Sequence, residues 1–176
     1  MEMNYCRRCG SKIKSIDGHV YNCDNGHTIY ANSAPAVGLF ILTPENHVML
    51  SVRGIEPHKG MLDAFGGFVD SAETFEEAIS REMEEELQLT PDQYETPVYI
   101  ASGTDPYPYQ GEEITFVSAL FWSRLKAGAT PIPSDDVADT VTIPLHEVDL
   151  DKLHSGDIRI GIIELRKLFP QGDERI

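Results

Sequence analysis

The stretch from Gly66 to Leu89, GGFVDSAETFEEAISREMEEELQL, constrains the fold most, because a diglycine turn runs directly into carboxylates at helical spacing. At about 100° per residue, a helix here carries an apolar stripe that is expected to pack on a core. The stripe consists of Phe75, Ala78, Ile79, Met83 and Leu87. Glu82 and Glu86 point into this stripe, and Glu85 lies at its edge. The sequence therefore predicts a helix with acidic groups beside its buried face.

These three glutamates are expected to lie close together. Spacings of three and four residues bring Glu82, Glu85 and Glu86 within about 5–6 Å of one another at Cβ. Such charges repel, and unpaired carboxylates near a core are costly, so a hard divalent cation with a preference for oxygen would stabilise the arrangement. The alternative, a solvated acidic face, suits only the carboxylates that project to the opposite side, which are Glu76, Glu77 and Glu84.

The order of residues in this stretch resembles the Nudix box. The matching pattern is Gly67, five residues, Glu73, seven residues, Arg81-Glu82-Met83, one residue, Glu85-Glu86, one residue, Gln88-Leu89. The family has a glycine where Gln88 stands. Glycine at a helix end commonly supplies a left-handed cap, so the substitution leaves the shape of the exit turn open but retains every carboxylate.

The resemblance implies the fold and the metal ligands. The expected fold is of the α+β class, an α/β/α Nudix sandwich in which a mixed sheet lies between the box helix and a C-terminal helix. One to three Mg²⁺ or Mn²⁺ ions are expected to bind to Glu82, Glu85, Glu86 and the Gly66 carbonyl. Asp136-Val137 stands where related enzymes place a further glutamate ligand, and Glu112 and Glu113 are rival donors.

The resemblance also implies roles in catalysis. Glu85 is the first candidate for the general base and Glu82 the second. Arg81, eight positions after Glu73, is interpreted as the partner in an ion pair that orients the carboxylates.

Residues 1–32 are predicted to form a zinc ribbon ahead of a Nudix domain at 33–176. Cys6-x2-Cys9 and Cys23-x3-His27 offer four soft or borderline ligands in two pairs, which suits one structural Zn²⁺ ion. In the similar NADH pyrophosphatases the second pair is also Cys-x2-Cys, whereas Gly26 stands at that place here. Either His27 completes the site, with His19 a less well-spaced substitute, or the ribbon has lost its metal.

Apolar runs predict the remaining elements. Strands are expected at 36–42, 48–52, 98–102 and 114–121, and helices at 145–153 and 155–168. Arg53 ends the second strand, where the family often has an arginine near the substrate's phosphates; the alternative is a surface strand terminus. Phe65 stacks on a base or nicotinamide, or else belongs to the core.

A loop rich in proline and aromatic residues is predicted at 103–111. Such loops on a rigid scaffold often form binding walls, so Tyr107 and Tyr109 are candidates for substrate contact. The alternative is a rigid surface turn. The loop is loosely similar to the aromatic and proline motif that follows the box in NADH pyrophosphatases.

Charge and length limit the partners. The formal net charge of −15 argues against nucleic acid, although a nucleotide can still bind through metal ions. No apolar run approaches a membrane span, and the polar start MEMNYCRRCG is unlike a signal peptide, so we expect a cytoplasmic protein without a membrane partner. The sequence is compatible with a homodimer and does not decide the oligomeric state.

The expected function is hydrolysis of the diphosphate linkage in a small nucleoside diphosphate joined to another moiety, of the NADH or ADP-ribose class. The first alternative is a Nudix-type sensor that binds a nucleotide without cleaving it. The second is an interaction role carried by the ribbon alone.

Overall fold

The computed structural model describes residues 4–109 and 111–171. The chain divides into two compact units. The first, here called the ribbon unit, comprises Met1–Ala34 and Pro106–Phe116; the second, the sandwich unit, comprises Pro35–Asp105 and Val117–Ile176. The ribbon unit therefore contains a second segment, from the region of the chain after residue 32.

The ribbon unit is built on a three-stranded antiparallel sheet. Its strands are β1 (Ile13–Asp17), β2 (Val20–Cys23) and β3 (Thr28–Tyr30), in that order. Among the side chains that the structure describes in residues 4–34, Cys6, Cys23 and Ile29 form a buried cluster, with Ile13 packed against them. A cluster of this size is too small to stabilise a fold without a further constraint such as a metal ion.

The second sheet is mixed and has six strands, in the order β6-β5-β4-β8-β7 with β9 also paired to β5. The strands are β4 (Ala34–Leu42), β5 (His47–Arg53), β6 (Leu62–Asp63), β7 (Val98–Tyr109), β8 (Glu112–Arg124) and β9 (Val137–Pro144). The tip of the β7–β8 hairpin belongs to the ribbon unit.

The prediction of a loop at 103–111 is wrong, because β7 continues through this segment to Tyr109. Proline lacks the N–H that a central strand requires, and this made the segment resemble a loop. However, β7 is the edge strand of the sheet, and Pro106 and Pro108, two residues apart, face the same way. Both missing N–H groups can therefore lie on the unpaired side.

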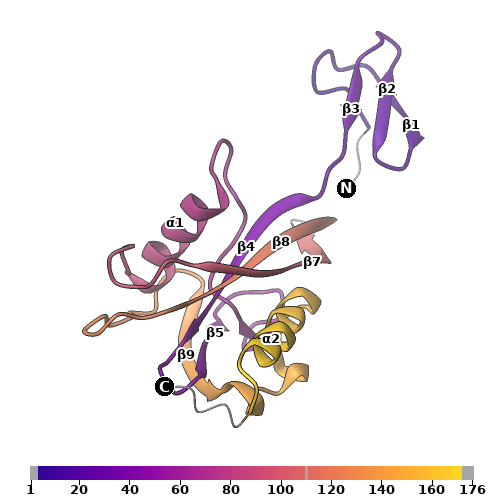
Figure 1. Ribbon diagram of the computed structural model, residues 1–176. Helices are drawn as coiled ribbons and strands as arrows, with labels where there is room; N and C mark the ends of the chain where they lie inside the picture. The colour runs from indigo at the N-terminus through magenta and orange to yellow at the C-terminus, as the bar shows by residue number, and fades with distance from the viewer. Residues whose placement is uncertain (1–3, 110, 172–176) are drawn as a thin grey trace. The chain divides into compact units, whose positions relative to one another are not determined.

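Two helices cover opposite faces of this sheet, α1 (Phe75–Leu87) and α2 (Gly156–Leu168), as Figure 1 shows. The helix expected at 145–153 is instead two 3₁₀ turns, η1 (Leu145–Glu147) and η2 (Leu150–Lys152). Asp149 separates them, with an extended backbone and a side chain that accepts from the N–H of Asp151 at 3.1 Å. This local bond competes with a continuous helix.

Strand β4 joins the two halves of the core. Its side chains alternate, so that Leu39 and Ile41 lie in a cluster with the buried face of α1, while Phe40 and Leu42 lie in a second cluster with α2. All four are at most 1% exposed. A strand that is buried on both faces has a continuous run of apolar residues. The strand was predicted from such a run.

The ends of α1 are set by local bonds. Thr74 and Glu77 form a capping box at the N-terminus. At the other end Gln88 has φ 55° and ψ 35°, the left-handed conformation that glycine would supply. Its N–H donates to the carbonyl of Glu84 at 3.0 Å, so the exit turn keeps the glycine-type shape.

Candidate active site

The diglycine turn passes directly against the carboxylates of α1. Gly66 has φ 143°, and a Cβ there would lie 2.2 Å from the carbonyl oxygen of Val37, so only glycine fits. Its N–H donates to Oε2 of Glu86 at 2.9 Å. A Cβ on Gly67 would lie 2.5 Å from Oε1 of Glu82. The turn therefore places bare backbone beside both buried acids.

The three helix glutamates differ in exposure. Glu82 and Glu86 are 8% and 6% exposed, whereas the side chain of Glu85 is 49% exposed. Burial and, to a lesser extent, the charges of Glu82, Asp63 and Asp136 raise the pKa of Glu86 to about 9, although the hydrogen bond from Gly66 opposes the shift. Burial also raises the pKa of Glu82, although Arg81 opposes this. The helix thus presents two carboxyls that resist ionisation beside a third that reaches solvent.

Arg81 ties these acids together. Its Nε and Nη2 donate to the two oxygens of Glu73 at 3.0 and 3.1 Å, a bidentate pair. Its Nη1 donates to Glu82 at 2.7 Å and to Glu85 at 3.0 Å, and Nη2 also donates to the carbonyl of Phe68 at 3.0 Å. The hydrogen bonds with Arg81 lower the pKa of Glu73. One guanidinium therefore orients two of the candidate ligands.

The loop before β9 is tied to the end of α1. Ile132 N–H donates to the carbonyl of Leu87, and Ser134 N–H to that of Glu86, both at 2.9 Å. These bonds satisfy carbonyls that the helix end leaves unpaired. They hold the following Asp135 and Asp136 close to the cluster.

The charges of these two aspartates act on the buried acids, since Asp135 raises the pKa of Glu82 and Asp136 that of Glu86. The sequence singled out Asp136 as a ligand but gave no role to Asp135. The rival donors Glu112 and Glu113 belong to the ribbon unit.

Arg53 is paired with an acid that the sequence did not single out. Its Nη1 donates to Asp63 at 2.8 Å, and its Nε donates to the carbonyl of Pro57 at 3.1 Å. Burial raises the pKa of Asp63 to about 6, and the charge of Arg53 opposes this. The available signal was an acidic residue between apolar Leu62 and Ala64, just before the diglycine turn.

The aromatic candidates have different surroundings. Phe65 is 1% exposed and packs in the α1-side core, so its role as a stacking surface is wrong: its ring has no face left for a ligand. Tyr107 lies in the ribbon unit, with its ring edge-on to Phe116 at 6.4 Å between centroids. The side chain of Tyr109 lies outside the part of the chain that the structure describes.

The donor set fits a hard divalent cation. All side-chain ligands in the cluster are carboxylates, the type that Mg²⁺ and Mn²⁺ prefer. A buried acid such as Glu86 is stable only when it is protonated or neutralised by a cation. Its pKa of about 9 means that, without a metal ion, Glu86 stays protonated at neutral pH. Glu82, Glu85, Glu86 and Asp136, with the backbone at Gly66, are the groups that would hold the ions.

The ribbon unit contains a second possible metal centre. The ligand atoms of Cys6, Cys9, Cys23 and His27 all lie within 4.8 Å of one another, and the three cysteines are free thiols. Cys9 Sγ lies 3.7 Å from Cys23 Sγ, and Cys6 Sγ lies 3.6 Å from His27 Nδ1. Zn–S bonds of about 2.3 Å give a tetrahedral S–S edge of about 3.8 Å, so the cluster fits Zn²⁺.

Two similar turns explain how His27 reaches the cluster. Gly10 N–H donates to the carbonyl of Cys6 at 2.8 Å, and Gly26 N–H donates to that of Cys23 at 2.9 Å. Both glycines have positive φ, 73° and 76°. Gly26 thus serves as the turn residue, and the ring nitrogen of His27, one position later, lies with the three sulfur atoms where a fourth cysteine would stand.

Side-chain bonds at Cys9 favour its thiolate. The hydrogen bonds with the side chain and the backbone of Ser11 are the largest causes, followed by that from Asn25, and together they lower the pKa of Cys9 to about 5. The thiolate is the form that binds a metal ion.

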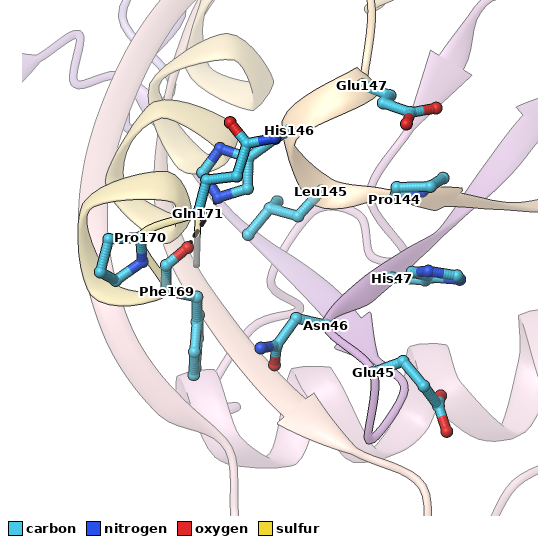
Figure 2. Close-up of a pocket in the computed structure, with 10 residues that line it drawn as sticks. All are labelled: Glu45, Asn46, His47, Pro144, Leu145, His146, Glu147, Phe169, Pro170 and Gln171. Carbon is cyan, nitrogen blue, oxygen red and sulfur yellow. Dashed lines mark hydrogen bonds between the residues drawn. The ribbon is translucent and has the colours of Figure 1, made fainter. Parts of the chain in front are cut away.

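A cavity of about 300 Å³ lies at a different place in the sandwich unit, at the β4–β5 turn (Figure 2). It is lined by Glu45, Asn46, His47, Pro144, Leu145, His146, Glu147, Phe169, Pro170 and Gln171. None of the buried acids of the cluster is among them. A concave shape usually marks a binding site, but the chemistry here lies with the carboxylates, so we assign the candidate active site to the diglycine turn.

A family model described as NUDIX domain matches residues 32–161. An ADP-ribose pyrophosphatase of Methanocaldococcus jannaschii is 35% identical over 103 residues, 58% of this chain and 60% of that protein. The human mitochondrial NAD(P)H pyrophosphatase NUDT13 is 31% identical over 105 residues, 59% of this chain and 29% of that protein. The chain therefore matches less than two thirds of the length of either curated relative.

Among solved structures, a Nudix hydrolase from Nitrosomonas europaea has a TM-score of 0.67 at 20% identity, covering 97% of this chain and 94% of that one. This likeness concerns the fold alone. Within the described residues, no helix is long and apolar enough to cross a membrane. The family model spans most of the chain and includes the diglycine turn, α1 and its carboxylates. The chain belongs to the Nudix family.

Proposed function

We propose that this protein is a divalent-metal-dependent pyrophosphohydrolase that cleaves the diphosphate linkage of a nucleoside diphosphate joined to another moiety. The observation that carries the proposal is the packing of Glu82 and Glu86 against the diglycine turn, with Glu85 beside them at the surface. Burying two acids beside bare backbone costs free energy, and a bound cation would offset this cost.

Each residue has a distinct task in this reaction. Bound Mg²⁺ or Mn²⁺ would neutralise charge on the phosphate oxygens and lower the pKa of a water. Glu85 accepts the proton of the attacking water, because it is the most exposed of the three acids, with Glu82 the second candidate. Arg81 holds Glu82 and Glu85 in position. Arg53 contacts the substrate's phosphates, and Asp63 orients it.

The substrate class is taken from the relatives. Their names specify ADP-ribose in one case and NAD(P)H in the other, and both molecules carry a diphosphate with a nucleoside on one side and a second bulky group on the other. We therefore place ADP-ribose and NADH first among the substrates.

The ribbon unit has a structural role in this proposal. One Zn²⁺ ion bound by Cys6, Cys9, Cys23 and His27 would hold together a fold whose own core is very small. The short separations among the four ligand atoms support this assignment.

The test is a screen for hydrolysis with Mg²⁺. ADP-ribose, NADH, dinucleoside polyphosphates and nucleoside triphosphates are each incubated with the protein, and nucleotide release is followed. Wild type is expected to cleave the first two with the highest kcat/KM. Binding of ADP-ribose without turnover of any compound would instead make the protein a nucleotide sensor.

Glu85→Gln is expected to lower kcat by at least about a hundredfold, because an amide neither binds the cation well nor accepts a proton. The matched control is Glu84→Gln, one residue earlier on the same helix but exposed to solvent on the other face. The control should retain wild-type activity. Equal activity of both variants at saturating Mg²⁺ would remove Glu85 from the mechanism.

A further inference from the structure

Two histidines that are far apart in the sequence face each other in the sandwich unit. His58 lies in the turn between β5 and β6, and His154 lies just before α2. Their Nδ1 atoms are 2.9 Å apart, and their ring centroids are 5.0 Å apart. Neither residue belongs to the carboxylate cluster or to the cysteine cluster.

We propose that His58 and His154 form a binding site for a divalent transition-metal ion that prefers imidazole ligands at right angles, such as Ni²⁺, separate from the carboxylate cluster. Imidazole nitrogen is a preferred ligand for these ions, whereas Mg²⁺ prefers oxygen. Two nitrogen ligands at about 2.1 Å from one ion and at a right angle to each other lie about 3.0 Å apart. The observed separation of 2.9 Å is close to this value.

The protonation of His154 suits metal binding. Burial, followed by the charges of Arg53 and His58, lowers the pKa of His154 to about 4, so its ring is neutral at pH 7. Only one of the two facing Nδ1 atoms can carry a proton when both rings are neutral. For an ion to bind both Nδ1 atoms, the ring that carries the shared proton would take the tautomer protonated at Nε2, and water would complete the coordination sphere of the ion.

Charged groups of both signs act on His154. Arg53 opposes the approach of a cation, but it is bound to Asp63 at 2.8 Å. Asp105 contributes a negative charge near His154, and its Oδ2 accepts from the N–H of Gly156 at 2.5 Å. The backbone also holds His154 in place, since its N–H donates to the carbonyl of Leu62 at 2.8 Å. One of the two ligands is therefore fixed before an ion arrives.

The competing explanation is that the pair is only a hydrogen bond that joins the β5–β6 turn to the start of α2. Metal titration separates the two. The protein, with its ribbon zinc retained and with excess Mg²⁺ to fill the carboxylate cluster, is titrated with Ni²⁺ by calorimetry, while zinc release is followed with a chromophoric chelator. The expected result is one Ni²⁺ bound per chain without release of zinc.

Variants assign the ion to the pair. His58→Ala and His154→Ala should each weaken Ni²⁺ binding at least about tenfold, and the double variant should abolish it. His47→Ala is the control, because it removes a partly buried histidine of the same unit outside the pair, and it should bind Ni²⁺ like wild type. The double glutamine variant, with longer polar side chains, is used if the alanine variant does not fold.

A spectroscopic measurement gives a direct result. Paramagnetic Ni²⁺ should broaden the ring signals of His58 and His154 before those of the other histidines. Two outcomes would overturn the proposal: unchanged Ni²⁺ affinity in the folded double variant, or first broadening at other histidines. Either outcome leaves the proposed hydrolase activity untouched, because that activity rests on the carboxylate cluster.

Discussion

Glu86 shows how burial changes the behaviour of one residue. At its exposure of 6%, the folded metal-free protein retains a proton on this carboxyl up to about pH 9, whereas the unfolded chain releases it near the ordinary glutamate pKa. Between these two pH values the folded state binds more protons than the unfolded state. The metal-free protein therefore loses stability as the pH rises through this range.

The same proton should link Mg²⁺ binding to pH. A cation must displace it, so we expect Mg²⁺ affinity to rise between pH 6.5 and 8.5 by up to about tenfold per unit, with proton release on binding. Calorimetry in buffers of different ionisation enthalpy measures both quantities. Glu86→Gln should bind Mg²⁺ weakly and without this pH dependence. Affinity that is independent of pH in wild type would contradict the assignment of Glu86 as a ligand.

Gln88 carries a conformational cost at the end of α1. Its φ of 55° lies in the left-handed region, where glycine has no penalty. We expect Gln88→Gly to raise the free energy of unfolding by about 0.5–1 kcal/mol, the relief of strain less the extra entropy of the unfolded chain. Urea denaturation measures the change. Gln88→Ala is the control, since it keeps the strain; if the alanine variant is as stable as the glycine variant, the strain argument is wrong.

At the scale of elements, α2 is placed by a glycine. A Cβ on Gly161 would lie 2.3 Å and 2.4 Å from two ring atoms of Phe40, and Phe40 has no exposed surface into which it could move. Gly161→Ala should therefore destabilise the protein by about 1–3 kcal/mol, the usual cost of overpacking a core.

Urea denaturation also tests this prediction. Ile160→Ala, at an exposed position of the same helix, should change stability by less than about 0.5 kcal/mol. Adding Phe40→Leu to Gly161→Ala should recover part of the loss. No loss in Gly161→Ala would mean that the helix can shift away from β4.

Elements with a local signal were predictable from the sequence. The helix α1 has helical periodicity and a capping box at Thr74, and β4 is one apolar run. The sequence placed α2 within one residue of its observed start. The sequence analysis neither extended β7 through Pro106 nor divided the segment at Asp149. The first outcome depends on the edge position of β7, which is set by neighbours in space, and the second depends on a local hydrogen bond of the Asp149 side chain that apolar periodicity does not reveal.

The candidate site divides in the same way. The box glutamates and Arg81 follow from spacing along one helix. The Arg53–Asp63 pair and the facing histidines join separate elements, and residues 96 apart leave no periodic signal. Phe65 was ambiguous because a large apolar residue suits both a core and a stacking surface, and only burial decides between them.

At the scale of the whole molecule, the two units should respond differently to loss of zinc. A strong chelator is expected to raise amide hydrogen exchange in residues 4–34, because little besides the metal holds this fold, and to leave α1 and α2 protected. Metal analysis should find one Zn²⁺ per chain before treatment. His27→Ala should lower this content and show the same exchange pattern without chelator. Unchanged exchange in the ribbon after complete zinc removal would show that its strands need no metal.

The ribbon unit is also discontinuous in sequence, since it combines residues before Ala34 with Pro106–Phe116. During synthesis, more than half of this chain must therefore be translated before both segments of the ribbon unit exist. Several strands of the sandwich unit are synthesised in the interval between the two segments. For the same reason, the N-terminal segment alone does not contain the whole ribbon unit and cannot be moved to another protein as a complete unit. Cutting the gene before Pro35 would leave the β7–β8 tip in the shortened protein without the segment with which it forms a unit.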